Sequence, residues 1–354
     1  MNQTKTYYHS IDVFRLICAV AVVVVHITSQ IPSNGIATWS NYYSYRYVLD
    51  IGSPFFFMAA GFILYRKSKE IGPGYLLTYA KKIFSYYLIF SIFYMITRVI
   101  LEAISASLLN ESVRVAIETQ LNQWRTLNLL NGSIGSFQLY FLVILIYSAL
   151  FLYILLRYKA NTLALVTIAV ALYAAENAGL LSNLNIFEYK SFAFGLLFVT
   201  LGFALSHSKE FITYKTPWLY TILFGAAYVC NYYYQVGLGW ILLPLFTFSL
   251  GAFCVQYHTL GKSSLLTKLS TYSLAIYTLH IFVELLILKT VEVLGWSDYY
   301  ANPLYYVGTI VACIVIPILI FHPIYNGAIW IKETFIFSQK KPSGKSELRK
   351  QNYG

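Results

Sequence analysis

Acidic side chains are scarce in this sequence, which has 14 Asp and Glu against 25 Lys and Arg in 354 residues. Charged residues of both signs make up only 11% of the chain, whereas 58% of the residues are hydrophobic, and the mean hydropathy is +0.62. A soluble domain cannot cover so much apolar surface with so few charges. The composition therefore excludes an ordinary soluble globular protein.

Cysteine is scarce as well, with four residues that all fall inside long apolar stretches and form no close pair. This spacing indicates neither a disulfide framework nor a cysteine metal site, and we expect no bound metal. The sequence also lacks a glycine-rich phosphate loop, a heptad repeat and an internal repeat. A P-loop nucleotide site, a coiled coil and a repeat architecture thus have no support in the sequence.

Long apolar runs are what the sequence has instead, each of about 20 residues, the length that crosses a hydrocarbon core of ~30 Å. Helices are the expected form, because lipid offers no partner to the backbone groups of an open sheet. We expect an all-α polytopic membrane protein whose residues 1–325 form one domain of ten spans. The expected spans are residues 10–28, 47–65, 83–101, 137–156, 162–179, 189–206, 218–235, 239–257, 271–292 and 304–325.

Basic residues outside these spans alternate between the two sides of the membrane. Eighteen lie in the N-terminal stretch, the even-numbered loops and the C-terminal tail, against three (Arg46, Arg114 and Arg125) in the odd-numbered loops. Because Lys and Arg accumulate in cytoplasmic loops, we expect both termini to be cytoplasmic and the protein to lie in the plasma membrane. The net charge of +11 is then an orientation signal, with no nucleic-acid partner expected. Residues 326–354 are expected to form a basic cytoplasmic tail whose last part is disordered.

The first span carries three ionisable residues, Asp12, Arg15 and His26. Eleven helical steps of ~100° separate Arg15 from His26, so both lie on one face, about 16 Å apart along the axis. Asp12 is close enough to pair with Arg15. Either Arg15 and His26 extend to the two interfaces, or they form a polar stripe that lines a cavity. Imidazole favours the cavity, because it exchanges a proton near neutral pH and rarely anchors a helix.

Three sequence blocks resemble a known family. The pattern Asp12-x-x-Arg15, ten residues and His26 is similar to the first span of acyltransferase family 3, whose members O-acylate carbohydrates and other envelope molecules. The blocks "GSPFFFMAAGFILYRK" (52–67) and "LSTYSLAIYTLHIFVE" (269–284) resemble two further family segments, although Ala60 stands where a serine is usual. The resemblance implies a membrane enzyme that moves an acyl group, expected to be acetyl, from cytoplasmic acyl-CoA to a hydroxyl of an extracytoplasmic polysaccharide or glycolipid.

Acyl transfer to an alcohol needs a base near the hydroxyl and cationic groups for the anionic donor. His26 suits the base, while the resemblance implies that Arg15 contacts the donor and that Asp12 orients Arg15. Arg66, Lys67 and Lys82 are candidates for the phosphates of CoA. The rule that cytoplasmic loops are positive explains these last three residues equally well.

The ninth expected span adds His280 and, one turn later, Glu284. His280 is a candidate catalytic residue by resemblance, and a hydrogen-bonded structural histidine is the alternative. A carboxylate inside a membrane needs a partner. Glu284 is therefore a further candidate, with His280 or Arg98 of the third span as its partner.

The longest outer connection, residues 109–136, contains Trp124, Arg125 and Asn128. It either covers an acceptor entrance or forms an amphipathic surface segment. A different class of function also stays open for the whole chain, namely an exporter of a polysaccharide or small molecule that uses the same polar cavity without acyl transfer.

The charge asymmetry makes a prediction about topology. Reporter fusions after residues 35, 130 and 297 should be extracytoplasmic, and fusions after residues 75, 210 and 350 should be cytoplasmic, because basic loops remain inside. Alkaline phosphatase and green fluorescent protein fusions measure the two sides. One inverted reporter would mean that a span is miscounted and that the depths of Arg15 and His26 are wrong.

Overall fold

The computed structural model describes residues 6–29, 46–182, 186, 190–208, 216–296 and 302–331. Within these ranges every regular element is a helix, which confirms the all-α fold class. The elements are α1 (His9–Thr28), η1 (Arg46–Ile51), α3 (Gly52–Ile71), α4 (Tyr75–Leu108), α5 (Val113–Leu121), α6 (Thr126–Asn131), η2 (Phe137–Leu139), α7 (Tyr140–Arg157), α8 (Thr162–Asn177), α9 (Phe192–Ser208), α10 (Pro217–Tyr233), α11 (Gly239–Gln256), α12 (Leu265–Leu269), η4 (Ser270–Tyr272), α13 (Ser273–Val293) and α14 (Pro303–Ile331).

Seven helical stretches in the described part of the chain are long and apolar enough to cross a membrane, and they contain α1, α3, α4, α7, α11, α13 and α14. The chain is thus a multi-pass membrane protein. Helices α8, α9 and α10 occupy the other three expected ranges with 16, 17 and 17 residues, so the number of ten spans stays a prediction. Residues 326–331 of the expected tail belong to α14, and residues 332–354 lie outside the described ranges.

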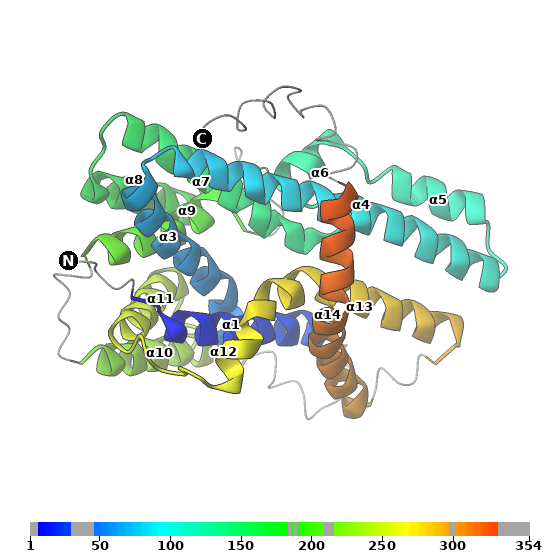
Figure 1. Cartoon of the computed structure of the whole chain (residues 1–354). Helices are drawn as coiled ribbons and strands as arrows, with labels where there is room; N and C mark the ends of the chain where they lie inside the picture. The colour runs from blue at the N-terminus through cyan, green and yellow to red at the C-terminus, as the bar shows by residue number, and fades with distance from the viewer. Residues whose placement is uncertain are drawn as a thin grey trace, which may run out of the picture.

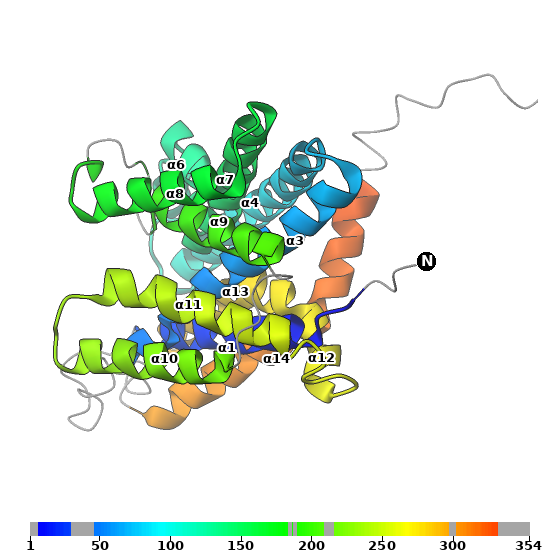
Figure 2. The same ribbon diagram turned by 90° about the vertical axis from the view of Figure 1, so that its left-hand side faces the viewer.

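Helix α1 lies in the interior, where it contacts α3, α11, α13 and α14. Figure 1 shows α14 crossing α1 and α13 steeply. Figure 2 shows α7, α8 and α9 in the upper part of the molecule and the pair α10 and α11 below them. Because α3 contacts α1, α9 and α11, it joins these two groups of helices.

The start of α1 is fixed by the segment that follows α11. No side chain caps the first turn, but the backbone N–H of His9 donates to the carbonyl oxygen of His258 at 2.9 Å. The buried hydroxyl of Ser10 donates to the carbonyl oxygen of Cys254 at 2.5 Å. The first bond satisfies an N–H group that a helix start leaves without a partner, and both bonds hold the end of α1 that carries Asp12 and Arg15.

Helices α3 and α9 approach each other through glycines. A Cβ atom on Gly61 of α3 would lie 1.9 Å from the backbone oxygen of Val199, and one on Gly202 of α9 would lie 1.9 Å from the backbone oxygen of Met58. Small residues allow this close backbone contact. In lipid, where no hydrophobic effect drives helices together, such close van der Waals packing stabilises their association. The two glycines therefore hold α3 against α9.

Replacing Gly202 by alanine should lower the melting temperature of the purified protein, because the new methyl group meets backbone that cannot rotate away. Overpacking of this kind costs about 1–3 kcal/mol. The matched control is Gly308→Ala on α14, where a Cβ atom meets nothing within 4 Å. Thermal denaturation in one detergent compares them, and equal melting temperatures for the two variants would contradict the packing argument.

Candidate active site

The expected pair at the start of α1 is present in the structure. Arg15 Nη1 lies 3.5 Å from Asp12 Oδ1, and the hydroxyl of Tyr7 donates to Asp12 Oδ2. This hydrogen bond, together with partial burial, raises the pKa of Tyr7 to about 12. Tyr7 therefore stays protonated at neutral pH, and the Asp12 carboxylate is held between a phenol and a guanidinium.

Two of the basic donor candidates lie at this end of the bundle. Arg66 Nη2 donates to the carbonyl oxygen of Thr6 at 3.0 Å, and its guanidinium lies 4.9 Å from the centre of the Tyr8 ring. Since Thr6 and Tyr8 directly precede α1, Arg66 lies near the end of the helix that carries Arg15. The side chain of Arg15 is 30% exposed and can therefore meet a ligand.

The two lysine candidates lie in more exposed surroundings. Lys67 forms an ion pair with Glu70 at 3.2 Å. Lys82 is exposed, and its ammonium lies 5.8 Å from the centre of the Tyr86 ring on the next turn of α4. Exposed pairs of this kind contribute little stability.

The far end of α1 brings the two histidine candidates together. The ring centroids of His26 and His280 are 5.3 Å apart with an interplanar angle of 34°. Phe137 closes the other side of His26, with the ring centroids 4.8 Å apart. His280 is fully buried, whereas His26 is partly exposed, so His26 is the more accessible of the two rings.

The hydrogen bond of His280 indicates which nitrogen carries its proton. Nδ1 lies 3.0 Å from the carbonyl oxygen of Ile276, and a carbonyl oxygen only accepts, so the proton of the neutral ring belongs on Nδ1. Nε2 then presents a lone pair, and it has no hydrogen-bond partner among the residues that the structure describes. Buried polar atoms are normally paired, so this nitrogen is a candidate for chemistry.

Glu284 and Arg98 both lie near Tyr94 of α4. Glu284 is 4% exposed, and Glu284 and Arg98 each interact electrostatically with the Tyr94 hydroxyl. That hydroxyl donates to the carbonyl oxygen of Thr278 at 2.6 Å and accepts from the N–H of Phe282 at 3.2 Å. Glu284 and Arg98 thus lie near the same buried tyrosine, and the partnership of Glu284 with His280 or Arg98 stays a prediction.

Sequence reasoning did not single out Tyr94, Phe137 or Gln138. Gln138 is fully buried; its backbone oxygen accepts from the Tyr277 hydroxyl at 3.2 Å, and its side-chain oxygen accepts from the Ser136 hydroxyl. The available signal was the polar pair Ser136 and Gln138 at the start of a long apolar run. Buried polar side chains inside a membrane bundle cost free energy unless they form hydrogen bonds. This pair therefore indicated a hydrogen-bonded contact between helices.

The site therefore has two ends on one helix. Asp12 and Arg15 stand at the start of α1, and His26 stands eleven residues further on, about 16 Å along the axis. One end offers cationic groups for an anion, and the other offers imidazole nitrogens for proton transfer. Helical membrane proteins with polar groups collected inside the bundle are enzymes, transporters or channels.

The comparison with protein families selects among these classes. A family described as an acyltransferase domain, acyltransferase family 3, matches residues 8–322, nearly the whole chain. The chain belongs to this family, which confirms the resemblance found in its first, second and ninth expected spans. No curated protein and no solved structure gave a match.

Proposed function

We propose that the protein is a membrane O-acyltransferase that moves an acyl group, acetyl in the simplest case, from cytoplasmic acyl-CoA to a hydroxyl of an extracytoplasmic polysaccharide or glycolipid. The family supports acyl transfer in general. The donor and acceptor sides of the proposal are supported by the two-ended site. A partly exposed His26 packs beside His280 at one end of α1, and Arg15 lies at the other end.

The orientation of the chain gives the two ends their roles. In the plasma membrane, with ten spans and both termini inside, α1 runs outward. Arg15 and Arg66 then face the cytoplasm, where acyl-CoA is available, and His26 faces the side of the acceptor. A donor that enters from one side and an acceptor that enters from the other would meet inside the bundle, away from bulk water.

The chemistry assigned to His26 is general base catalysis. Its ring nitrogen removes the proton from the acceptor hydroxyl, and the freed oxygen attacks the carbonyl carbon of the thioester. The carbon–sulfur bond then breaks, and the protonated ring returns its proton to the sulfur of CoA. The bond between Nδ1 and the carbonyl oxygen of Ile276 keeps His280 in one tautomer, and its ring packs beside His26, where it would hold the His26 ring in place.

The donor would be held by cations at the start of α1. Guanidinium groups bind phosphate oxygens through two parallel hydrogen bonds, which an ammonium cannot reproduce. Arg15, oriented by Asp12, and Arg66, which lies over the Tyr8 ring, offer two guanidinium groups at this end of α1. Lys67 and Lys82 add positive charge at the same surface.

Replacing His26 by alanine should reduce acyl transfer by a factor of about 10²–10⁴, the usual contribution of a positioned base. The measurement is transfer of isotopically labelled acetyl from acetyl-CoA to envelope glycan by the protein in proteoliposomes. In the wild type the rate should fall as the pH is lowered, because only a neutral imidazole accepts a proton. Binding of acyl-CoA should be nearly unchanged in the variant.

The control is His207→Gln, which should transfer acetyl at the wild-type rate. The His207 imidazole contacts the Tyr65 hydroxyl at 2.7 Å, and it lies near the end of the bundle opposite His26. Full activity of His26→Ala would sink the assignment of the base. Wild-type protein that neither binds nor cleaves any acyl-CoA would overturn the enzyme and favour the exporter.

Replacing Arg15 by alanine should weaken binding of acyl-CoA, because it removes a guanidinium from the donor end and leaves Asp12 paired only with Tyr7. Arg15→Lys should restore part of the affinity, since the charge returns without the planar fork. Equilibrium binding of radiolabelled CoA to well-folded variants measures both effects. Unchanged affinity in Arg15→Ala would reassign the arginine to a structural role.

A further inference from the structure

A polar pocket of about 240 Å³ lies beside Phe137, the ring that packs on His26. Its walls come from α4, α5, α6, η2 and the segments between them. Phe137 belongs both to the pocket wall and to the surroundings of His26, whereas His26 itself does not line the pocket. A ligand held there would therefore meet Phe137 and lie one aromatic ring away from the proposed base.

The pocket offers a ligand no free charge. Eight of its nine lining residues are uncharged, and the ninth is Arg98. The Nε of Arg98 donates to the carbonyl oxygen of Gly135 at 2.5 Å, and its guanidinium lies near the Tyr94 hydroxyl together with the buried carboxylate of Glu284. An ionised ligand would lose hydration in the pocket without meeting a free opposite charge. The lining therefore favours an uncharged ligand.

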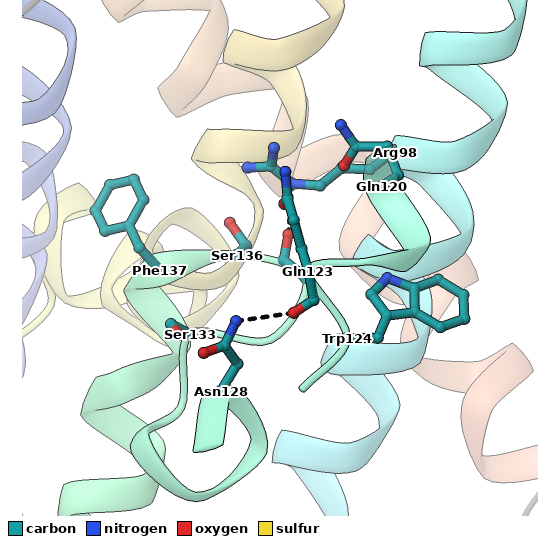
Figure 3. Close-up of a pocket in the computed structure, with 9 residues that line it drawn as sticks. Arg98, Gln120, Gln123, Trp124, Asn128, Ser133, Ser136 and Phe137 are labelled. Carbon is teal, nitrogen blue, oxygen red and sulfur yellow. Dashed lines mark hydrogen bonds between the residues drawn. The ribbon is translucent and has the colours of Figure 1, made fainter. Parts of the chain in front are cut away.

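Side-chain amides give the pocket neutral donors and acceptors. The amides of Gln120 and Gln123 form no hydrogen bond with any residue that the structure describes. Gln120 is only 9% exposed, and buried polar groups normally have a partner. Asn128 Nδ2 donates to the carbonyl oxygen of Gln123 at 2.8 Å, as the dashed line in Figure 3 shows, which leaves its Oδ1 to accept. Hydroxyl groups, which both donate and accept, match these amides.

Aromatic rings flank these polar groups. Figure 3 shows Trp124 on one side of the pocket and Phe137 on the other, with the side chain of Gln123 between them. An aromatic ring presents a flat apolar face, which suits the C–H groups on one face of a sugar ring. A pyranose combines such an apolar face with hydroxyl groups around its edge. The lining therefore favours an uncharged saccharide.

The volume limits how much of an acceptor the pocket can hold. Pockets for drug-sized ligands have volumes of about 300–1,000 Å³, so 240 Å³ suits one sugar ring and excludes a longer oligosaccharide. The rest of an acceptor would extend from the opening, where Trp124 is 39% exposed.

We propose that this pocket binds one uncharged sugar ring of the acceptor, with its hydroxyls on the amides of Gln120 and Gln123 and its ring against Trp124. Because His26 does not line the pocket, the bound ring is the neighbour of the sugar that carries the reacting hydroxyl. This inference rests on the proposed acyl transfer. It narrows the acceptor from any envelope glycan to one with at least two linked units, of which the unit in the pocket is neutral.

Binding of small glycosides in the absence of acyl-CoA tests the pocket independently of catalysis. Saturation-transfer NMR with the protein in nanodiscs of neutral lipid compares the methyl glycosides of glucose, galactose, mannose and N-acetylglucosamine with methyl glucuronoside, methyl galacturonoside and tetrahydropyran-2-methanol. At least one neutral glycoside should bind about tenfold more tightly than tetrahydropyran-2-methanol, a similar ring with one hydroxyl, which is the scale of one or two neutral hydrogen bonds. Neither uronoside should bind more tightly than its neutral parent.

Two variants at exposed positions locate the binding and leave the buried core untouched. Trp124→Ala and Gln123→Ala should each weaken the neutral glycoside about fivefold, the scale of one lost ring contact or hydrogen bond. Trp240→Ala is the control for the tryptophan, because Trp240 is similarly exposed at 41% and does not line the pocket. Asn122→Ala is the control for the amide, because Asn122 is the neighbour of Gln123 and is also outside the lining. Both controls should bind as the wild type does.

Absence of binding by all four neutral glycosides, tighter binding of a uronoside, or unchanged binding in both variants would overturn this inference. Labelled acetyl-CoA and envelope glycan are then added to the same samples. The bound glycoside should inhibit transfer to the glycan and stay unacetylated, and its acetylation would overturn the placement beside the reacting unit. If glycosides bind as expected but no acetyl is cleaved or transferred, the proposed enzyme fails while the sugar pocket is supported. If acetyl is transferred but no glycoside binds, only the pocket assignment fails.

Discussion

Lipid imposes the main constraint on this protein, because a charged or polar side chain in hydrocarbon must find a partner inside the bundle. Asp12 lies between Arg15 and Tyr7, and Lys289 bridges Glu102 at 2.9 Å and Glu292 at 2.8 Å. Against this pattern, eight buried polar atoms of the described residues have no hydrogen-bond partner, and the Nε2 of His280 is the one that lies beside His26. A buried nitrogen without a hydrogen bond costs free energy, and proteins accept such costs mainly at functional sites.

Local features of the fold could be predicted from the sequence because they depend on neighbours along the chain. Apolar runs of the right length located the long helices but not the short α5, α6 and α12. The three-residue spacing predicted the pair of Asp12 and Arg15 that the structure contains. The contact between His26 and His280 depends on how α1 docks against α13. No periodicity in either helix contains that information, so the two residues could be named as candidates but not joined.

The segment 109–136 is a second case in which the sequence did not predict the tertiary contacts. Its sequence allowed either an amphipathic surface stretch or a cover over an entrance, because an amphipathic pattern predicts a polar face without saying what the face meets. In the structure α5 packs along α4, and Gln120, near the end of α5, turns toward the same pocket as Arg98. The structure thus shows where part of this segment packs, and whether it covers an entrance stays a prediction.

Phe137 belongs to two environments at once, since it lines the pocket between α4, α5 and α6 and packs on the His26 ring. A side chain shared in this way couples the free energies of both environments, and the coupling is reciprocal. A ligand that displaced the Phe137 ring would change the packing of the His26 imidazole, and a change at the imidazole would be felt at the pocket to the same extent. One aromatic ring thus links the two places, without any movement of the helices that carry them.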